Sequence, residues 1–183
     1  MLDLLQNARS SLPLTGDGLT LRLPERSDAR WIGGHARHPQ TALDLWLPMP
    51  YGIEGAGRLA EELVTGWDAP TRFGPSLVAD HREPFVAIFF LPVDAKRPEV
   101  AYGVAPEWRA RGIGTAGLRL VADWLLDSVP TLDHIELHID PENVASIRVA
   151  ERTGFTPAGK DRHEVPATGE RYEDVVYRRN RTE

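Results

Sequence analysis

Alternation of hydrophobic and polar residues predicts the strands of this chain. Leu19–Leu23 alternates strictly, and His134–Asp140 does so again in the second half of the sequence. A two-residue period of this kind is typical of strands that bury one face. Between these two stretches, three apolar runs separated by turn-forming residues predict an antiparallel meander. The three runs are Ser76–Asp80, Phe85–Leu91 and Glu99–Val104. Two more strands, Phe155–Val165 and Arg171–Arg178, are predicted to close the chain as a hairpin.

Apolar residues three or four positions apart predict the helices. This spacing occurs in Ile53–Trp67 and again from Gly114 to about Leu126. A third helix is predicted at Asn143–Thr153, because Gly154 follows it in the position where glycine commonly ends helices. These three helices and the strands around them account for most of the hydrophobic residues in the sequence.

The remaining segments are less regular. Ser27 and Asp28 offer caps for a short helix over Ala29–Gly34, and residues 41–52 are rich in proline and aromatic residues, which predicts a shaped loop. Residues 1–18 form a lead-in with room for a short helix.

The order of elements predicts an α+β (mixed α/β) fold with a mixed, mostly antiparallel sheet of about seven strands and about four helices. The length of 183 residues favours one domain, residues 1–183.

Composition narrows the function classes. The net charge is −6 and no basic run occurs, which argues against a nucleic-acid-binding face. The absence of cysteine excludes disulfides, thiolate metal sites and a cysteine nucleophile. The first residues do not resemble a secretory signal, and no window has the ~18 apolar residues of a membrane span. We therefore expect a cytoplasmic protein that acts without a membrane.

A motif at Gly112–Gly117 raises the first functional question. The stretch reads GIGTAG, which matches the G-x-G-x-x-G fingerprint of dinucleotide-binding turns, with Glu136 about 20 residues further on. That fingerprint should start at the end of its strand, but seven residues separate Val104 from Gly112. The fold would also need βαβαβ units, whereas a meander precedes the motif. The dinucleotide interpretation is therefore rejected.

The same turn still suits an anion. Gly112 and Gly114 allow close approach to backbone N–H groups at the start of a helix, where the dipole is positive. Arg109 and Arg111 flank the turn and can add charge-assisted contacts. The alternative is a turn that merely needs two glycines, which explains the glycines but not the arginines. From the residues alone, both interpretations stay open.

The surrounding sequence closely resembles a known family. The run Arg109-Ala-Arg-Gly112-Ile-Gly114 matches the Arg/Gln-x-x-Gly-x-Gly/Ala signature of the GNAT superfamily, the Gcn5-related N-acetyltransferases. Downstream, the Asn-x-x-Ser pattern of Asn143 and Ser146, followed by Gly154-Phe155, is similar to its branch of bacterial ribosomal-protein N-terminal acetyltransferases, the RimJ/RimL type. Trp46-Leu-Pro-Met-Pro-Tyr51 also looks like that branch. The resemblance covers roughly residues 19–178. One departure is Ala101, where the branch usually has glycine.

The resemblance implies an acyltransferase that moves an acetyl group from acetyl-CoA to a primary amine, without a metal or a covalent enzyme intermediate. It implies that the turn cradles the pyrophosphate of CoA, that the main chain of Val104 pairs with the pantetheine arm and that Asn143 bonds this arm. Asn143 can equally be an ordinary N-cap. The residues expected to bind the coenzyme are Val104, Arg109, Ala110, Arg111, Gly112, Ile113, Gly114, Thr115, Asn143 and Ser146.

Catalytic and acceptor residues follow from the same resemblance. Glu99 is the candidate base, through water, although a strand-edge salt bridge explains it equally well. Ser146 is the candidate proton donor to the leaving thiolate, with a solvent-side helix serine as the alternative. A backbone N–H of the strand ending at Gly103-Val104 is expected to stabilise the oxyanion.

The acceptor site is expected to be lined by aromatic residues, namely Trp46, Tyr51 and Tyr102, although such residues more often belong to a core. His134 and His138 share one strand face, but metal binding would need a third ligand. The sequence leaves open whether the acceptor is a protein N-terminus, a polyamine, an amino sugar or an antibiotic amine. It also leaves open a homodimer and a non-catalytic acyl-CoA-binding module on the same fold.

Overall fold

The computed structural model describes residues 2–28, 31–32, 53–69, 75–81, 83–92, 94, 98–164 and 171–182. Its helices are α1 (Leu2–Ala8), α4 (Ile53–Thr65), α5 (Ile113–Ser128) and α6 (Val144–Arg152), with three short 3₁₀ turns at Arg9–Ser11, Arg26–Asp28 and Pro106–Trp108. Its strands are β1 (Leu14–Gly16), β2 (Leu19–Arg22), β3 (Ser76–His81), β4 (Glu83–Phe90), β5 (Ala101–Val104), β6 (His134–Ile139), β7 (Thr156–Glu164) and β8 (Arg171–Asn180).

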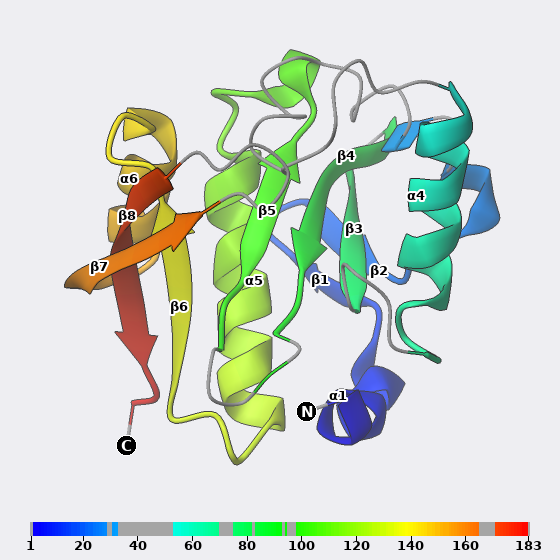
Figure 1. Cartoon of the computed structure of the whole chain (residues 1–183). Coiled ribbons are helices and arrows are strands. Elements are labelled where there is room, and N and C mark those ends of the chain that lie inside the picture. The colour runs from blue at the N-terminus through cyan, green and yellow to red at the C-terminus, as the bar shows by residue number, and fades with distance from the viewer. Residues whose placement is uncertain are drawn as a thin grey trace.

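Five strands form an antiparallel sheet in the order β1-β2-β3-β4-β5. Alternate residues of its central strands point to opposite faces, as the pleat of a strand requires. Leu77 and Phe89 belong to the main core, which α5 completes on one face, while Val78 and Ile88 pack with α4 on the other. Helices therefore cover both faces of this sheet (Figure 1).

The other three strands form a second antiparallel sheet in the order β6-β8-β7. Along β6, Ile135, Leu137 and Ile139 are buried in the main core, whereas His134, Glu136 and His138 alternate with them. This alternation gives the small sheet one apolar face and one polar face.

Within the part of the chain that the structure describes, one bridge joins the two sheets, which then separate. Glu99 forms a parallel bridge with Glu136 of β6, and the Val100 N–H donates to the Glu136 carbonyl at 2.9 Å. From Ala101 onward the chain pairs with β4, while β6 continues along β8. In Figure 1, β5 and β6 accordingly diverge toward the end of the molecule where α5 begins. β5 is thus an edge strand whose backbone faces the gap.

Most of the predicted elements are confirmed, and their differences have local causes. The predicted strand Glu99–Val104 is divided, because its first residues pair with β6 and its last four with β4. The structure adds β1, a three-residue strand inside the lead-in. The predicted hairpin is formed by β7 and β8. Of the helix predicted over residues 29–34, only residues 31 and 32 are described, and the predicted loop 41–52 lies outside the described residues.

The glycine that completes the GIGTAG pattern has a packing role. A Cβ atom on Gly117 would lie 2.2 Å from Cζ of Phe89, a side chain that is fully buried in the main core. Such a distance is far inside van der Waals contact, so glycine is needed here for the close packing of α5 on β4. The sequence similarity to a dinucleotide motif at this position therefore reflects helix–sheet packing.

No helix among the described residues combines the length and the hydrophobicity that a membrane span needs.

Candidate functional site

The turn before α5 has a backbone shaped for an anion. Ala110 and Gly112 both have positive φ angles, 58° and 81°, and Gly112 is the N-cap residue of α5 without a side-chain cap. The first intrahelical bond runs from the Ala116 N–H to the Gly112 carbonyl at 2.9 Å. The N–H groups of residues 113–115 therefore have no acceptor within the helix and point out of its positive end. Successive N–H groups of this kind form anion-binding concavities.

The two glycines of the turn serve different purposes. A Cβ atom on Gly112 would meet no heavy atom within 4 Å, so this residue borders open space. A Cβ atom on Gly114 would instead lie 3.4 Å from Cε2 of Tyr102 and 3.5 Å from Cγ2 of Val104. The expectation that both glycines make room for a ligand thus fits Gly112, whereas the Cβ position of Gly114 points at β5.

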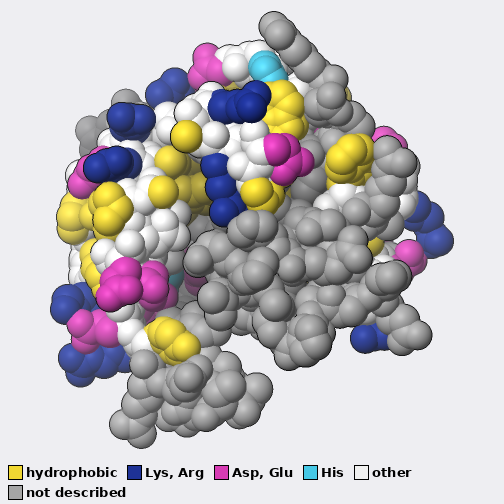
Figure 2. All heavy atoms as spheres, turned by 90° about the horizontal axis from the view of Figure 1, so that it is seen from above, with side chains coloured by type: hydrophobic (Ala, Val, Ile, Leu, Met, Phe, Trp, Pro, Cys, Tyr) yellow, Lys and Arg dark blue, Asp and Glu magenta, His cyan; other side chains and the backbone are white. Residues whose placement is uncertain are grey.

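The arginines beside the turn are placed by protein contacts. The Arg109 Nε–H donates to the Val104 carbonyl at 3.1 Å. The guanidinium of Arg111 lies over the ring of Trp108 at 5.0 Å, a cation–π geometry. Both side chains are exposed and lie within a few residues of the α5 N-terminus. Figure 2 looks down on this end of the molecule, where Lys and Arg side chains lie among hydrophobic ones.

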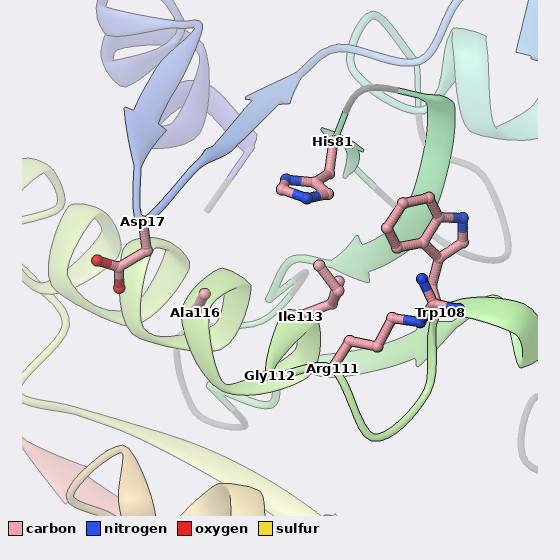
Figure 3. Close-up of a pocket in the computed structure, with 7 residues that line it drawn as sticks. All are labelled: Asp17, His81, Trp108, Arg111, Gly112, Ile113 and Ala116. Atoms are coloured by element: carbon pink, nitrogen blue, oxygen red, sulfur yellow. The ribbon is translucent and has the colours of Figure 1, made fainter.

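A pocket of about 430 Å³ opens beside the start of α5 (Figure 3). Its lining residues are Asp17, His81, Trp108, Arg111, Gly112, Ile113 and Ala116. Nδ1 of His81 lies 2.7 Å from the Gly18 carbonyl and carries a proton when it donates to this oxygen. The His81 ring stands edge-on to Trp108, with 5.3 Å between ring centroids. Local sequence patterns give no signal for His81, which the β3–β4 meander brings here.

α6 lies against the same end of α5. The Cβ position of Gly114 is 3.7 Å from Cγ2 of Val149 on α6, and Ser146 is one helical turn before Val149 on the same face. Asn143 is the N-cap of α6, since its Oδ1 accepts from the Ser146 N–H at 3.1 Å. The capping interpretation of Asn143 is confirmed, and its side-chain NH₂ group stays available as a donor. Its contact with a ligand stays a prediction.

Tyr102 points toward α5. Its ring stacks on Phe89 with 5.8 Å between centroids and packs against the main core. Glu99 and Ala101 precede it with the opposite alternation, so their side chains lie on the other face of β5. The proposed acceptor role of Tyr102 stays a prediction, while Trp46 and Tyr51 lie outside the described residues.

Glu99 shares its face with a charged cluster on the polar side of the small sheet. Residues paired across a parallel bridge point to the same side, so Glu99 lies beside Glu136. Arg178 of β8 donates from Nη2 and Nε to Oε1 of Glu136 at 2.6 Å and 3.1 Å. Nε2 of His134 lies 3.4 Å from the same oxygen. Within the described residues, no group of three His, Cys, Asp or Glu has the geometry of a metal site.

Glu136 carries the resolved pKa shift of this cluster. Burial raises its pKa, but the contacts with Arg178 and His138 outweigh burial, so the pKa of Glu136 lies below its ordinary value of 4.5. A lowered pKa means that folding favours the ionised carboxylate. The resulting stability is fully present above about pH 4.5 and is lost as pH falls through the lowered value.

We expect a Glu136→Gln variant to be less stable than wild type by about 1 kcal/mol or less at pH 7, because the cluster is partly exposed. The difference should shrink below pH 4, where the carboxylate becomes protonated. Urea unfolding from pH 3 to 7 measures it, with Glu151→Gln on the exposed side of α6 as the matched control. A difference that stays constant over this pH range would contradict the assignment of the shift to Glu136.

Comparison with known proteins decides the family. The model of the acetyltransferase (GNAT) domain matches residues 18–156, which include the turn, β5, α5 and α6. The chain belongs to the GNAT acetyltransferase family. The resemblance of Arg109–Gly114 and of the Asn143–Phe155 segment to this family is thereby confirmed. The architecture built on these segments is the α+β fold that the sequence predicts.

Relatives of this GNAT acetyltransferase include the Bacillus subtilis protein named "Putative ribosomal N-acetyltransferase YdaF", which is 24% identical over 87% of this chain and 88% of its own. Among solved structures, a GNAT-family acetyltransferase from Bacillus anthracis covers 93% of this chain and 99% of its own, with a TM-score of 0.78 and 14% identity. The structure of Mycobacterium smegmatis RimJ in complex with CoA-disulfide matches with a TM-score of 0.70 and 22% identity. This match covers 88% of this chain and 81% of that chain. These structural similarities extend over nearly the whole fold.

Proposed function

We propose that this GNAT acetyltransferase transfers an acetyl group from acetyl-CoA to a primary amine by direct attack of the amine on the thioester. The observation that carries the proposal is the uncapped N-terminus of α5 at Gly112, which borders open space next to the diverging edge of β5. This arrangement offers a cradle for a pyrophosphate beside an edge strand that can pair with an extended amide chain. The RimJ structure with CoA-disulfide supports this choice of coenzyme.

The residues around the turn suit the parts of the coenzyme. The N–H groups of residues 113–115 would hold the pyrophosphate, with Arg109 and Arg111 adding positive charge from the turn itself. Alternation along β5 directs the N–H of Val104 toward β6, because the N–H of Ala105 donates to the Val86 carbonyl on the β4 side. The pantetheine arm would therefore lie along this edge, within reach of the Asn143 side chain at the start of α6.

The chemistry requires alignment, oxyanion stabilisation and proton handling. The amine nitrogen forms a bond to the thioester carbon, the C–S bond breaks, and the sulfur takes a proton. We assign proton removal from the amine to Glu99, through water, because its half-buried side chain lies where β5 and β6 begin to diverge. We assign the proton for the sulfur to Ser146, which lies on the α6 face that contacts α5. A backbone N–H of β5 would stabilise the oxyanion.

The acceptor is a primary amine, either on a protein N-terminus or on a small molecule. The similarity to YdaF, which is named as a putative ribosomal N-acetyltransferase, supports an amine of a ribosomal protein as one candidate. We propose Trp46, Tyr51 and Tyr102 as residues that contact the acceptor. A cytoplasmic location and a homodimer stay predictions of the sequence.

Replacing Gly112 tests the coenzyme site. We expect Gly112→Asp to weaken CoA binding more than tenfold, which is over ~1.4 kcal/mol, because a carboxylate would occupy the open space that the pyrophosphate needs. Calorimetric titration with CoA measures the affinity. Gly112→Asn is the matched control, since Asn and Asp have the same shape and both tolerate a positive φ. The Asn variant should bind CoA more tightly than the Asp variant. Unchanged CoA affinity in folded Gly112→Asp would overturn the assignment of this turn.

A further inference from the structure

A row of titratable side chains leads away from the point where the sheets meet. It consists of Glu99 before β5, Glu136 and His138 on β6, and Asp161 on β7, and we call it the titratable row. Glu136 neighbours Glu99 through the parallel bridge, and His138 follows two residues later on the same face of β6. Asp161 belongs to β7, on the far side of β8 from β6, yet its side chain reaches His138.

His138 occupies the middle of this row with a carboxylate on each side. Its Nδ1 lies 3.3 Å from Oδ2 of Asp161, and its Nε2 lies 3.5 Å from Oε2 of Glu136. The His138 side chain is only 10% exposed, whereas that of Asp161 is 33% exposed. An imidazolium has an N–H on each nitrogen, so both protons would face a carboxylate oxygen. Each N–H group of a protonated His138 ring would therefore have a carboxylate oxygen beside it.

The proposed reaction needs an exit for one proton. At neutral pH a primary amine is largely an ammonium ion, because alkyl amines have pKa values of about 10 and protein α-amino groups of about 8. Converting an ammonium and a thioester into an amide and a thiol releases two protons from nitrogen. The sulfur takes one, and the other must reach solvent. Among side chains in general, a carboxyl group has an ordinary pKa of about 4 and an imidazole of about 6.5, so an imidazole is the better proton carrier near neutral pH.

We propose that His138 receives the proton that the acceptor amine loses near Glu99, and passes it to solvent at Asp161. This inference rests on the proposed acetyl transfer and adds a positioning and relay residue that acts through Glu99. The ring takes the proton through Glu99, Glu136 or intervening water, becomes an imidazolium held by the two carboxylates, and then returns to the neutral form. This step makes and breaks only N–H bonds and the O–H bonds of the groups that pass the proton.

The other charged groups on the polar face of the small sheet have different effects on the titratable row. Arg178 on β8 neutralises Glu136, which prevents Glu136 from remaining protonated, in line with the lowered pKa of that carboxyl. Asp174 on β8 pairs in register with Asp161 and adds negative charge at the solvent end of the row. His134 contacts Glu136 as well, but it lies two residues before the bridge, on the side away from the diverging strands. His134 is therefore the matched control for His138.

The test compares His138→Ala and His134→Ala, which remove the same group from the same strand face. Thiol release from acetyl-CoA with an amine that wild type accepts gives kcat and KM between pH 5.5 and 9. We expect His138→Ala to lower kcat at least tenfold, with the KM for acetyl-CoA unchanged, and added imidazole to restore a large part of kcat. The acidic limb of the pH profile should change in this variant. His134→Ala should behave like wild type. His138→Gln, which fills the site but cannot carry a proton, should be as slow as His138→Ala.

Two outcomes would overturn the proposal. The first is a wild-type kcat and pH profile in folded His138→Ala and His138→Gln. The second is a slow His138→Ala variant with an unchanged pH profile and no response to imidazole, which indicates a structural role. Failure of the proposed acetyl transfer is recognised separately, because wild type itself would then release no thiol with any amine.

Discussion

A Glu99→Gln variant is expected to release thiol from acetyl-CoA about a hundredfold more slowly than wild type at pH 7, with unchanged CoA affinity. A positioned general base contributes typically 10²–10⁴-fold, and a hundredfold loss corresponds to about 2.7 kcal/mol in the activation barrier. Glutamine keeps the size and much of the hydrogen bonding of Glu99 but cannot take a proton. The side chain lies beside the diverging strands and away from the α5 N-terminus, so coenzyme binding should not change.

Glu107→Gln is the matched control for this variant. Glu107 lies in the 3₁₀ turn just before the Arg109–Gly114 turn, and its side chain is exposed. The control therefore removes the same charge from an exposed position outside the strands that carry Glu99. Equal rates for wild type and Glu99→Gln would show that Glu99 is not the base.

Ser146→Ala should lower kcat by a smaller factor, and an unchanged kcat in that variant would remove Ser146 from the mechanism.

The largest expected loss of stability follows from Arg22→Ala. Arg22 on β2 donates from both terminal nitrogens to Asp28, at 2.8 Å each, and from Nε to Asp80 on β3 at 2.8 Å. Asp28 is only 2% exposed and also accepts from the Glu25 N–H. Removing Arg22 leaves a buried carboxylate without its cation, which typically costs 3–5 kcal/mol. Because Arg22 keeps some solvent access, we expect a loss of about 3 kcal/mol in the free energy of unfolding.

Arg26→Ala provides the control for this prediction. Arg26 also forms an ion pair, with Glu61 of α4 at 2.8 Å, but the two side chains are 78% and 50% exposed. Exposed pairs of this kind contribute about 1 kcal/mol or less. Urea unfolding of both variants at pH 7 gives the comparison. A loss of less than 1 kcal/mol in the free energy of unfolding of Arg22→Ala would contradict a stabilising role of the Arg22–Asp28 ion pair, which holds the chain after β2 against the sheet.

The helices next to the site were predictable because local chemistry determines them. Gly112 starts α5 and Gly154 ends α6 in the expected places, since glycine is the residue that adopts a positive φ at little cost. The N-cap role of Asn143 follows from the same kind of local rule. The Arg109–Gly114 segment carries a pattern specific enough to indicate the family from the amino-acid sequence alone, and the family match confirms it. Short-range signals therefore identified the Arg109–Gly114 turn and the helix that follows it.

Long-range pairing explains what the sequence did not show. The chain from Glu99 to Val104 reads as one strand, yet it divides between β6 and β4, and the partner of Glu99 on β6 is more than 30 positions away. Ala110 has a positive φ that its side chain does not favour, so local preference gave no warning of it. The need for Gly117 arises from Phe89, and the burial of Asp28 arises from Arg22.

The acceptor side of the site was the harder part for the same reason. Tyr102 and Glu99 are three residues apart, and only the observed pairing shows that Tyr102 faces α5 while Glu99 faces the charged cluster. The contact of Asp161 with His138 joins strands that are not neighbours in the sheet. The sequence identified both histidines as sharing one face but gave no indication of the contact between His138 and Asp161.

Thiol release from acetyl-CoA is the measurement that tests the central claim most directly. The purified chain would be mixed with acetyl-CoA and, separately, with N-terminal peptides, a polyamine, an amino sugar and an aminoglycoside, and free thiol would be followed over time. We predict thiol release above the background hydrolysis with at least one of these amines, together with the matching acetylated product. Tight binding of CoA without turnover for any amine would contradict acetyl transfer and favour a non-catalytic acyl-CoA-binding module.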